Sequence, residues 1–456
     1  MTYKILPLKV VGNPEKVVKM KILMFSWEFP PMIAGGLAMA CYGMVKSLLK
    51  KGVEVDLVLP TKELIYFAFR KVEDVDTLPI VFLEPEKQKA YLSLKFENIY
   101  KKTEYVGMTT FPETYYSPAV VATWSKLFES MILDRSESYA LSDRILFNLT
   151  QSLVGDEDIF KKVQEMASRA ARYAQELQYD MIHAHDWLTY PAGIIARKIS
   201  GKPLITQIHA TEFDRAGGFG DGRIHNLESD GMNFADMVIA VSKYTANMII
   251  SRYRVDSGKI RVLYNAYDVG KIPEKKVRIF KGPTILFLGR ITLQKGPDYF
   301  VEVADRVLKL NPHARFIVAG SGDMARKVLH RSASLKLKNR FLFAGFLNRK
   351  QVEEIFNSVD IYVMPSVSEP FGIAPLEAMA YGVTAVISKQ SGVSEVVQNA
   401  YKVDFWDIDE MARIIDYLIK NPDKCKEMGL AGRDEVFRIG WDEVATKLIS
   451  YYQENL

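Results

Sequence analysis

Two glutamates lie eight positions apart in the stretch SEPFGIAPLEAMAYG, residues 368–382. Pro375 suits the first turn of a helix, where its missing N–H has no partner to lose, and Gly382 suits the position just past a helix end. The pattern predicts a short helix with Glu369 in the loop before it and Glu377 in its first turn. A carboxylate in a first turn also favours the helix dipole, so Glu377 has a structural role available without any ligand. The spacing leaves open whether the glutamates form a catalytic pair or bind two separate groups.

Two predicted junctions between a loop and a helix can present backbone N–H groups to an anion. The groups near Phe371, Gly372 and Ile373 lie at the start of the helix above, where N–H groups have no partner within the helix. In WEFPPMIAGGLA, Gly35 and Gly36 precede a helix predicted to begin near position 38. Without Cβ atoms these glycines allow an anion to approach the backbone closely. A Gly-Gly pair is also an ordinary tight turn, so this junction decides little by itself.

Arg290 and Lys295 follow a predicted strand in the stretch GRITLQKG. Ligands of open parallel sheets bind beyond the carboxyl ends of the strands, which is where these two cations are expected. Arginine offers a planar fork of donors and lysine a point charge, so the pair suits a diphosphate. Two solvated surface cations are the alternative, and the position after a strand weakens it.

Two of the six histidines lie in HAHDW, after another predicted strand. Side chains alternate along a strand, which places His183 in the sheet and His185 near its end. A metal site would need further ligands, and His209 is the one obvious addition. We therefore expect no metal here and expect His185 to hydrogen-bond a sugar.

Two motifs resemble nucleotide-binding signatures without their usual setting. VAGSGDMA, residues 318–325, matches G-x-G-x-x-A after a strand. It follows the second strand of its domain rather than the first, and FLFAGFLN, about twenty residues on, offers no acidic residue for a ribose. Asp74 and Asp76 form a D-x-D in a charged stretch that ends no strand. Both a nicotinamide-linked enzyme and a metal–nucleotide site at the D-x-D are disfavoured.

Short β-branched runs alternate with helical periodicity, which predicts parallel sheets with helices on both faces. The predicted strands of the first part are 21–26, 53–60, 181–186, 203–210, 237–242 and 260–265. Those of the second part are 284–290, 314–320, 340–345, 361–366 and 384–388. The alternation restarts after VGKIPEKKVRIFKGP, so we expect a first domain over 1–265, a linker over 266–282 and a second domain over 283–440.

Residues 61–158 fit the alternation poorly, carry many aromatic side chains and are expected to form an insertion in the first domain. At the other end of the chain, apolar side chains recur at helical spacing in WDEVATKLISYYQENL. We therefore expect a final helix within 441–456 that packs on a domain surface.

Length and composition exclude several classes of protein. A chain of 456 residues is too long for one ordinary core, which predicts two domains. No apolar run approaches the roughly 20 residues that a membrane helix needs. The net charge of +5 is small, and no long basic block predicts a nucleic-acid partner. Two distant cysteines outside any CxxC pair predict neither a disulfide scaffold nor a zinc knuckle, and favour a cytoplasmic location.

The first residues do not read as a secretory signal, because they lack an apolar core and a small-residue cleavage site. The stretch KMKILMFSWEF at 19–29 reads like a second beginning. Residues 1–19 are therefore either an appended strand or a start-codon artefact.

Five elements in this order resemble the retaining glycosyltransferases of the GT-B fold, the superfamily of glycogen and starch synthases and group 1 glycosyltransferases. They are GG at 35–36, HAHDW at 183–187, GR-x4-KG at 289–296, AGSGDM at 319–324 and E-x7-E at 369–377. The resemblance spans about residues 20–450 and is specific for the superfamily, but does not name the sugar. It implies an α/β protein of two Rossmann-like, doubly wound parallel-sheet domains that face a cleft.

In the second domain, the resemblance implies a binding site for a nucleoside diphosphate sugar. Arg290 and Lys295 would hold the diphosphate, Glu377 the ribose and Glu369 the sugar, with the amides of residues 371–373 assisting.

In the first domain, the resemblance implies the side that receives the acceptor. Gly36 would approach the diphosphate across the cleft, and His185 would contact the donor sugar. HATEFDR lies where acceptor contacts are expected, which marks His209, Glu212 and Arg215. The final helix would cross back onto this domain.

Two departures from the family pattern bear on the substrate and the hinge. Bacterial-type glycogen and starch synthases carry Lys-x-Gly-Gly in the first loop, where this chain has Ile33, which weakens the case for ADP-glucose-dependent glucan synthesis. Near the hinge, Asn265-Ala266-Tyr267-Asp268 replaces a frequent Asn-Gly before an Asp, so the turn is expected to differ.

We therefore expect a retaining, metal-independent enzyme that moves a hexosyl unit, glucosyl first among the candidates, from a UDP- or ADP-sugar to a carbohydrate acceptor without a further cofactor. Fixed cations and helix amides would stabilise the charge that develops on the departing phosphate. A sugar-nucleotide epimerase or hydrolase of the same two-domain plan is the alternative enzyme. A non-catalytic carbohydrate-binding relative is the alternative outside enzymes, and it predicts loss of Arg290, Lys295 or Glu369, all of which are present.

Overall fold

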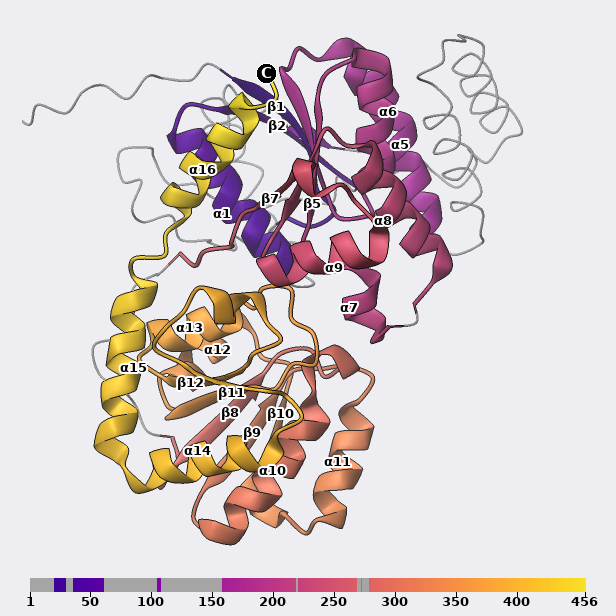
Figure 1. Ribbon diagram of the computed structural model, residues 1–456. Helices are drawn as coiled ribbons and strands as arrows, with labels where there is room; N and C mark the ends of the chain where they lie inside the picture. Colours follow the sequence, from indigo (N-terminus) through magenta and orange to yellow (C-terminus); the bar gives the residue numbers. More distant parts are fainter. Residues whose placement is uncertain are drawn as a thin grey trace, which may run out of the picture.

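The computed structural model describes residues 20–29, 36–60, 105–107, 158–218, 220–268, 272 and 279–456. Within these residues the chain forms two separate parallel sheets flanked by helices (Figure 1), which confirms the expected α/β architecture of two Rossmann-like domains. Gly35, Ile33, Asp74 and Asp76 lie outside the described residues, as do residues 1–19 and most of the expected insertion and linker.

The amino-terminal sheet has the strand order β3-β2-β1-β4-β5-β6-β7, and its neighbouring strands are parallel. The strands are β1 Lys21–Phe25, β2 Glu54–Leu59, β3 Tyr105–Gly107, β4 Met181–His185, β5 Leu204–Ile208, β6 Met237–Ala240 and β7 Ile260–Val262. All six strands expected here are present, and β3 lies within the stretch expected to be an insertion.

Helices cover both faces of this sheet, as its buried apolar strands require. One face packs against α1 (Gly36–Lys50) and α16 (Trp441–Gln453), and the other against α5 (Asp158–Glu176), α6 (Tyr190–Ser200) and α8 (Gly222–Phe234). Two further helices, α7 (Glu212–Ala216) and α9 (Lys243–Tyr253), follow β5 and β6. A 3₁₀ turn, Ser257–Lys259, precedes β7. Helix α1 begins at Gly36, two residues before the expected start.

The carboxyl-terminal sheet has the order β10-β9-β8-β11-β12-β13 and is also parallel. Its strands are β8 Thr284–Leu288, β9 Arg315–Ala319, β10 Phe341–Gly345, β11 Ile361–Met364, β12 Thr384–Ser388 and β13 Tyr401–Val403. The first five were expected, whereas β13 has only three residues and gives no pattern of its own.

Helices α10 (Pro297–Leu310), α11 (Ala325–Ser334) and α14 (Ile408–Lys420) pack on one side of this sheet. Helices α12 (Arg349–Phe356) and α13 (Ala374–Ala380) pack on the other, beside α15 (Pro422–Val436). Three 3₁₀ turns complete this part of the chain: η4 (Leu293–Lys295), η5 (Lys338–Arg340) and η6 (Gly392–Glu395).

After α15 the chain returns to the amino-terminal sheet, where α16 lies beside α1 (Figure 1). Trp441, Leu448 and Tyr452 of α16 belong to the same apolar cluster as α1 and β1. A Cβ atom on Gly43 of α1 would lie 2.2 Å from the Trp441 ring, so the two helices pack without room for a side chain there. The last helix therefore contributes to the core of the amino-terminal domain.

The two domains meet through segments that follow strand ends. Ser242, after β6, donates to the carbonyl oxygen of Pro370, after β11, at 2.6 Å. Ser368 donates to the carboxylate of Asp214, which lies in α7 after β5. The carboxyl edges of the two parallel sheets therefore face each other, and these are the edges at which ligands of such sheets bind.

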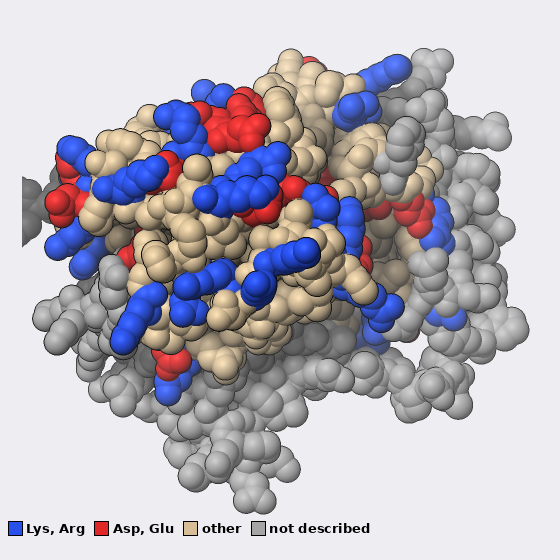
Figure 2. Space-filling view, turned by 90° about the horizontal axis from the view of Figure 1, so that it is seen from below, with Lys and Arg blue, Asp and Glu red and all other residues tan. Residues whose placement is uncertain are grey.

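The face of the molecule seen from below carries Lys and Arg side chains with Asp and Glu among them (Figure 2). Arg331 pairs with Glu302, and Lys309 pairs with Asp305.

Over the described residues, no helix combines the length and the apolar character required to cross a membrane.

Candidate active site at the facing sheet edges

The carboxyl-terminal sheet places Arg290, Lys295 and Glu369 at one point of its edge. The chain runs outward from β8 to β9 and β10, then returns to add β11 on the other side of β8. Such a reversal opens a crevice between the first strand and its new neighbour. Arg290 and Lys295 follow β8, and Glu369 follows β11, so all three flank this crevice.

Lys295 and Glu369 form a direct ion pair between their Nζ and Oε2 atoms. The hydroxyl of Ser366 also donates to this carboxylate, at 3.3 Å. Glu369 is nearly buried, and Lys295 keeps 22% of its side chain exposed. Gly296, with φ of 63°, lets the turn approach so closely that a Cβ atom would lie 2.1 Å from the carbonyl oxygen of Pro365. The cation is therefore fixed against the loop that carries the carboxylate.

The AGSGDM motif braces the loop that carries Arg290. Gly320 has φ of 137°, and a Cβ atom on it would lie 1.8 Å from the carbonyl oxygen of Gly289. The backbone N–H of Ile291 donates to the carbonyl oxygen of Ser321 at 2.8 Å. These glycines therefore allow close packing between two strand ends.

The exposed Arg290 donates to the side chain of Gln294 at 3.2 Å. Its guanidinium therefore lies beside Gln294, in the turn that ends in Lys295.

Glu377 lies in the first turn of α13, as expected, with Pro375 at the helix start and Gly382 at φ of 67° just beyond its end. Its carboxylate accepts from Arg349 at 3.0 Å, and Arg349 also donates to the hydroxyl of Tyr267 at 3.1 Å. Burial raises the pKa of Glu377, and Arg349 acts against this rise.

The sequence reasoning missed Arg349 as a partner of Glu377. A usable signal existed, because Arg349 follows the carboxyl end of β10 in the same way that Arg290 follows β8.

The loop from Glu369 to α13 is held by close contacts. Gly372 has φ of 95°, and a Cβ atom on it would lie 3.1 Å from Cγ of Glu369. The carbonyl oxygen of the buried Phe371 accepts from Val393 at 2.7 Å. Ile373 caps α13, and its side chain would lie 3.7 Å from a Cβ atom on Gly36. Gly36 of the first domain thus meets the E-x7-E segment across the domain interface.

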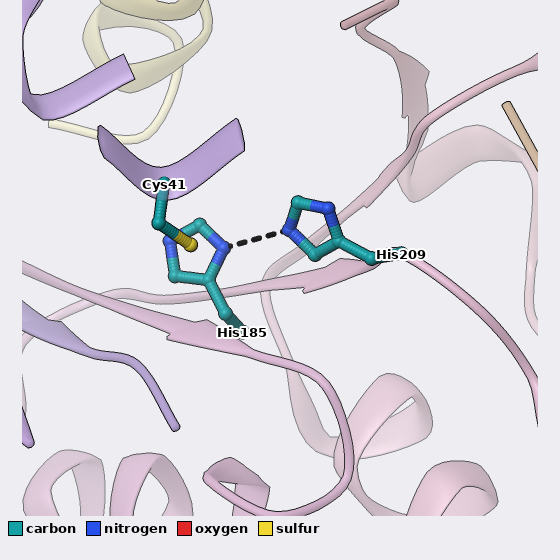
Figure 3. A group of neighbouring side chains, drawn as sticks. All are labelled: Cys41, His185 and His209. Carbon is teal, nitrogen blue, oxygen red and sulfur yellow. Dashed lines mark hydrogen bonds between the residues drawn. The ribbon is translucent and has the colours of Figure 1, made fainter. Parts of the chain in front are cut away.

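The amino-terminal sheet has the same kind of reversal between β1 and β4. Gly36 lies in the connection that leaves β1, and His185 is the last residue of β4. Nδ1 of His185 lies 3.0 Å from Nε2 of His209, with the thiol of Cys41 beside the His185 ring (Figure 3). His183 instead contacts the hydroxyl of Tyr452 in α16, at 2.7 Å. The structure thus brings the predicted His185 and His209 together at the second crevice.

Burial, which is complete for His183 and His185 and partial for His209, keeps these histidines neutral. It lowers the pKa of His183 and of His209 to about 3 and lowers that of His185 as well. Nε2 of His185 is buried and has no hydrogen-bond partner among the described residues. A neutral imidazole with one unengaged nitrogen can accept or donate one hydrogen bond to a ligand hydroxyl.

Among the described residues, Cys41, His185 and His209 form the group that could hold a metal ion, because their ligand atoms lie within 4.8 Å of one another. The sequence reasoning did not include Cys41, which α1 supplies from far along the chain. A metal would require the thiolate. Burial raises the pKa of Cys41 to about 12, and its sulfur accepts a hydrogen bond from Ser26 at 3.3 Å.

Glu212 and Arg215, the other residues expected on the acceptor side, are engaged with each other at 3.0 Å. Arg215 also pairs with Glu228 of α8, which receives a further hydrogen bond from Tyr253. Burial raises the pKa of Glu228 to about 7, with Arg215 opposing the rise. Helix α7, which carries Glu212 and Arg215, contacts the η4 turn that ends in Lys295.

The chain matches two protein families that together span residues 139–435. Residues 269–435 match the family described as glycosyl transferases group 1. Residues 139–271 match glycosyltransferase family 4.

Three known proteins illustrate the similarity. An uncharacterised glycosyltransferase of Methanocaldococcus jannaschii is 25% identical over 95% of this chain and 98% of its own length. A glycogen synthase of Mycobacterium tuberculosis is 26% identical over 60% of this chain and 68% of its own. The structure of Anabaena HepE in complex with UDP and glucose superposes with a TM-score of 0.63 at 18% identity, over 95% of this chain and 100% of that chain.

Proposed function

This chain belongs to the group 1 glycosyltransferases with the GT-B fold, and from this premise we propose that it catalyses a sugar transfer. A hexosyl unit, glucosyl first among the candidates, passes from a nucleoside diphosphate sugar to a carbohydrate acceptor with retention of configuration. The observation that carries the proposal is the ion pair between Lys295 and Glu369 at the crevice beside β8. It puts a cation for the diphosphate beside a carboxylate for the sugar.

The donor would lie along the carboxyl-terminal domain. Lys295 and Arg290 bind the diphosphate, Glu377 accepts hydrogen bonds from the ribose hydroxyls, and Glu369 faces the sugar. The amides at the start of α13, near residues 371–373, assist at the phosphate. The known complex of HepE with UDP and glucose supports a donor of this class, and the similarity to a glycogen synthase supports glucose as the first sugar to test.

The amino-terminal domain would complete the site when it meets the donor. Gly36 approaches the diphosphate, and His185, at the carboxyl end of β4, contacts the donor sugar once its buried ring becomes accessible. His209 orients that ring through its hydrogen bond. Glu212 and Arg215, which pair with each other, lie on the acceptor side.

The reaction breaks the bond between the anomeric carbon and the phosphate oxygen and forms one to an acceptor oxygen. Arg290 and Lys295 stabilise the charge left on the nucleoside diphosphate, in the manner of fixed dipoles and cations in other active sites. Glu369 is engaged by Lys295 and Ser366, so we assign it to sugar binding rather than to proton removal. The acceptor oxygen attacks the anomeric carbon on the face that the phosphate leaves, which gives retention, and its proton passes to the departing phosphate.

Two side-chain cations offer the positive charge that a divalent metal would otherwise supply, so we propose that transfer proceeds without one. Equal rates of turnover with and without EDTA would support this part of the proposal. A loss of activity in EDTA that Mg²⁺ or Mn²⁺ restores would contradict it.

The test is a panel of nucleotide sugars, including UDP-glucose and ADP-glucose, offered to the full chain with and without glucan or small-sugar acceptors. Release of nucleoside diphosphate that depends on the acceptor supports transfer. Equal release without an acceptor indicates a hydrolase instead, and failure to bind any donor overturns the proposal.

A further inference from the structure

The amino end of α9 is completed by a residue of the other domain. The first N–H groups of a helix have no partner within it and need an outside acceptor. Ser242 accepts from the N–H of Thr245 at 3.0 Å and so satisfies one of them. The N–H groups of Lys243 and Tyr244 instead donate to the two carboxylate oxygens of Glu395, at 2.9 and 2.7 Å.

Glu395 ends the η6 turn after β12, in the carboxyl-terminal domain. Besides the two amides, the hydroxyl of Tyr264 donates to its Oε2 at 2.9 Å. A carboxylate at a helix amino end is favoured by the helix dipole and by charge-assisted hydrogen bonds. The contact joins the two domains, so it stabilises the arrangement in which they meet.

The same end of α9 also holds the loop that carries Glu369. The hydroxyls of Ser242 and Thr245 both donate to the carbonyl oxygen of Pro370, at 2.6 and 3.3 Å. Gly392, three residues before Glu395, packs between these segments so tightly that a Cβ atom would lie 2.2 Å from that oxygen. Helix α9, the η6 turn and the loop at Pro370 therefore form one packed junction.

Glu369 is held from both sides at this junction. Its N–H donates to Gln390 at 2.9 Å, and its carbonyl oxygen accepts from Gly392 at 3.0 Å. The preceding residue, Ser368, contacts the hydroxyl of Tyr244 at 2.9 Å and donates to Asp214. A shift of η6 relative to α9 would therefore move the backbone of Glu369 and its pairing with Lys295.

We propose that Glu395 is a positioning residue, which locks the amino end of α9 onto the η6 turn and thereby fixes Glu369 for transfer when the domains close. This inference rests on the proposed function, because it assigns Glu395 to the same donor site. Among the described residues, the hydrogen bonds of Glu395 come from Lys243, Tyr244 and Tyr264, none of which is assigned to the diphosphate. Its removal should therefore impair turnover and spare binding of the nucleotide.

The test compares Glu395→Gln with Glu435→Gln in the full chain. Glu435 also accepts from two backbone amides, those of Gln398 and Asn399 at 2.6 and 2.8 Å, but entirely within the carboxyl-terminal domain. In Glu395→Gln, the side-chain NH2 group would face one of the backbone N–H groups of α9, and two donors cannot hydrogen-bond to each other. We expect Glu395→Gln to lower kcat by about 10- to 100-fold, as for lost charge-assisted hydrogen bonds, and to leave the Kd for UDP or ADP within about threefold. Glu435→Gln should keep kcat near that of the wild type.

A second pair of variants tests the contact from the α9 side without changing a carboxylate. Proline is tolerated at the first position of a helix, so Lys243→Pro should remove only the donated N–H, whereas Lys243→Ala retains it. We expect Lys243→Pro to lower kcat, Lys243→Ala to match the wild type, and the combination with Glu395→Gln to be less than multiplicative.

Several outcomes would overturn the inference while leaving the proposed function intact. One is that Glu395→Gln has the same kcat as an active wild type, and another is that Glu395→Gln and Glu435→Gln lose kcat equally. The others are that Glu395→Gln loses nucleotide binding together with kcat, or that Lys243→Pro and Lys243→Ala lose kcat equally. Absence of acceptor-dependent release in the wild type would instead overturn the proposed function, and this inference with it.

Discussion

At the scale of single residues, each of the two glutamates of the candidate donor site pairs with a cation that follows a different strand. Lys295 pairs with Glu369, and Arg349 pairs with Glu377. Such pairing holds long side chains in one orientation before a ligand arrives, which lowers the reorganisation needed during reaction. The E-x7-E spacing left open whether Glu369 and Glu377 act as a pair. In the structure each carboxylate instead contacts its own cation.

Replacement of Lys295 by alanine should slow transfer by about 100- to 1,000-fold, the usual effect of removing one group that stabilises developing charge. Turnover is measured as acceptor-dependent release of nucleoside diphosphate. Lys389→Ala is the matched control, because Lys389 also follows a strand of this sheet and pairs with a carboxylate, Asp404, at 2.8 Å. Near-normal turnover of Lys295→Ala, or an equal loss in the control, would contradict the diphosphate role.

The buried histidines should make the fold sensitive to acid. The pKa of His209 is about 3 in the folded chain, against an ordinary value of 6.5, so the unfolded chain binds this proton first. His209 therefore contributes stability that is present above pH 6.5 and is lost as the pH falls towards 3. Each such group changes the free energy of unfolding by about 1.4 kcal/mol per pH unit within that window.

Urea unfolding from pH 6.5 to pH 4 checks this expectation. His209→Gln should have a shallower dependence of stability on pH than the wild type, while a change of the exposed His330 to glutamine should leave the slope unaltered. Parallel curves for the wild type and His209→Gln would show that His209 is not buried as a neutral group.

At the scale of elements, both sheets present a reversal of strand order at the site, between β1 and β4 and between β8 and β11. The alternation of apolar runs and helical stripes predicted most strands because burial on both faces imposes that pattern on each strand separately. Ligands of open parallel sheets bind beyond the carboxyl ends of the strands. This rule drew attention to Arg290, Lys295, His185 and Glu369, which do lie at or after strand ends.

Partners that come from distant elements could not be read in the same way. Cys41 reaches His185 from α1, Glu228 reaches Arg215 from α8, and Tyr452 reaches His183 from α16. Each pair depends on how a helix packs on a sheet, and nothing in the local sequence of either residue encodes that packing. The strand β13 escaped prediction because three residues are too few for a period to appear.

Packing of the last helix on the first domain gives a prediction at this scale. Gly43→Ala would bring a Cβ atom within 2.2 Å of the Trp441 ring, so we expect the free energy of unfolding to fall by about 1 to 3 kcal/mol. Gly222→Ala is the control, because a Cβ atom there meets nothing within 4 Å. Urea titrations that give equal midpoints for the two variants would contradict the close contact between α1 and α16.

At the scale of the whole molecule, the candidate site is composite, because neither domain carries all of it. The carboxyl-terminal domain supplies the cations and the two glutamates, while the amino-terminal domain supplies Gly36 and His185. The contacts at Pro370, Ser368 and Glu395 bring the two sheet edges together. A transfer reaction suits this plan, since the donor and the acceptor can be bound by different domains and joined between them.

The most direct test of the central claim is a proton NMR time course with UDP-glucose or whichever donor the panel selects, a carbohydrate acceptor and the full chain. We predict a new α-anomeric signal of a glycoside, the same configuration as in the donor, that grows as the donor signal decays. A β-anomeric product, or free hexose as the only product, would contradict retaining transfer.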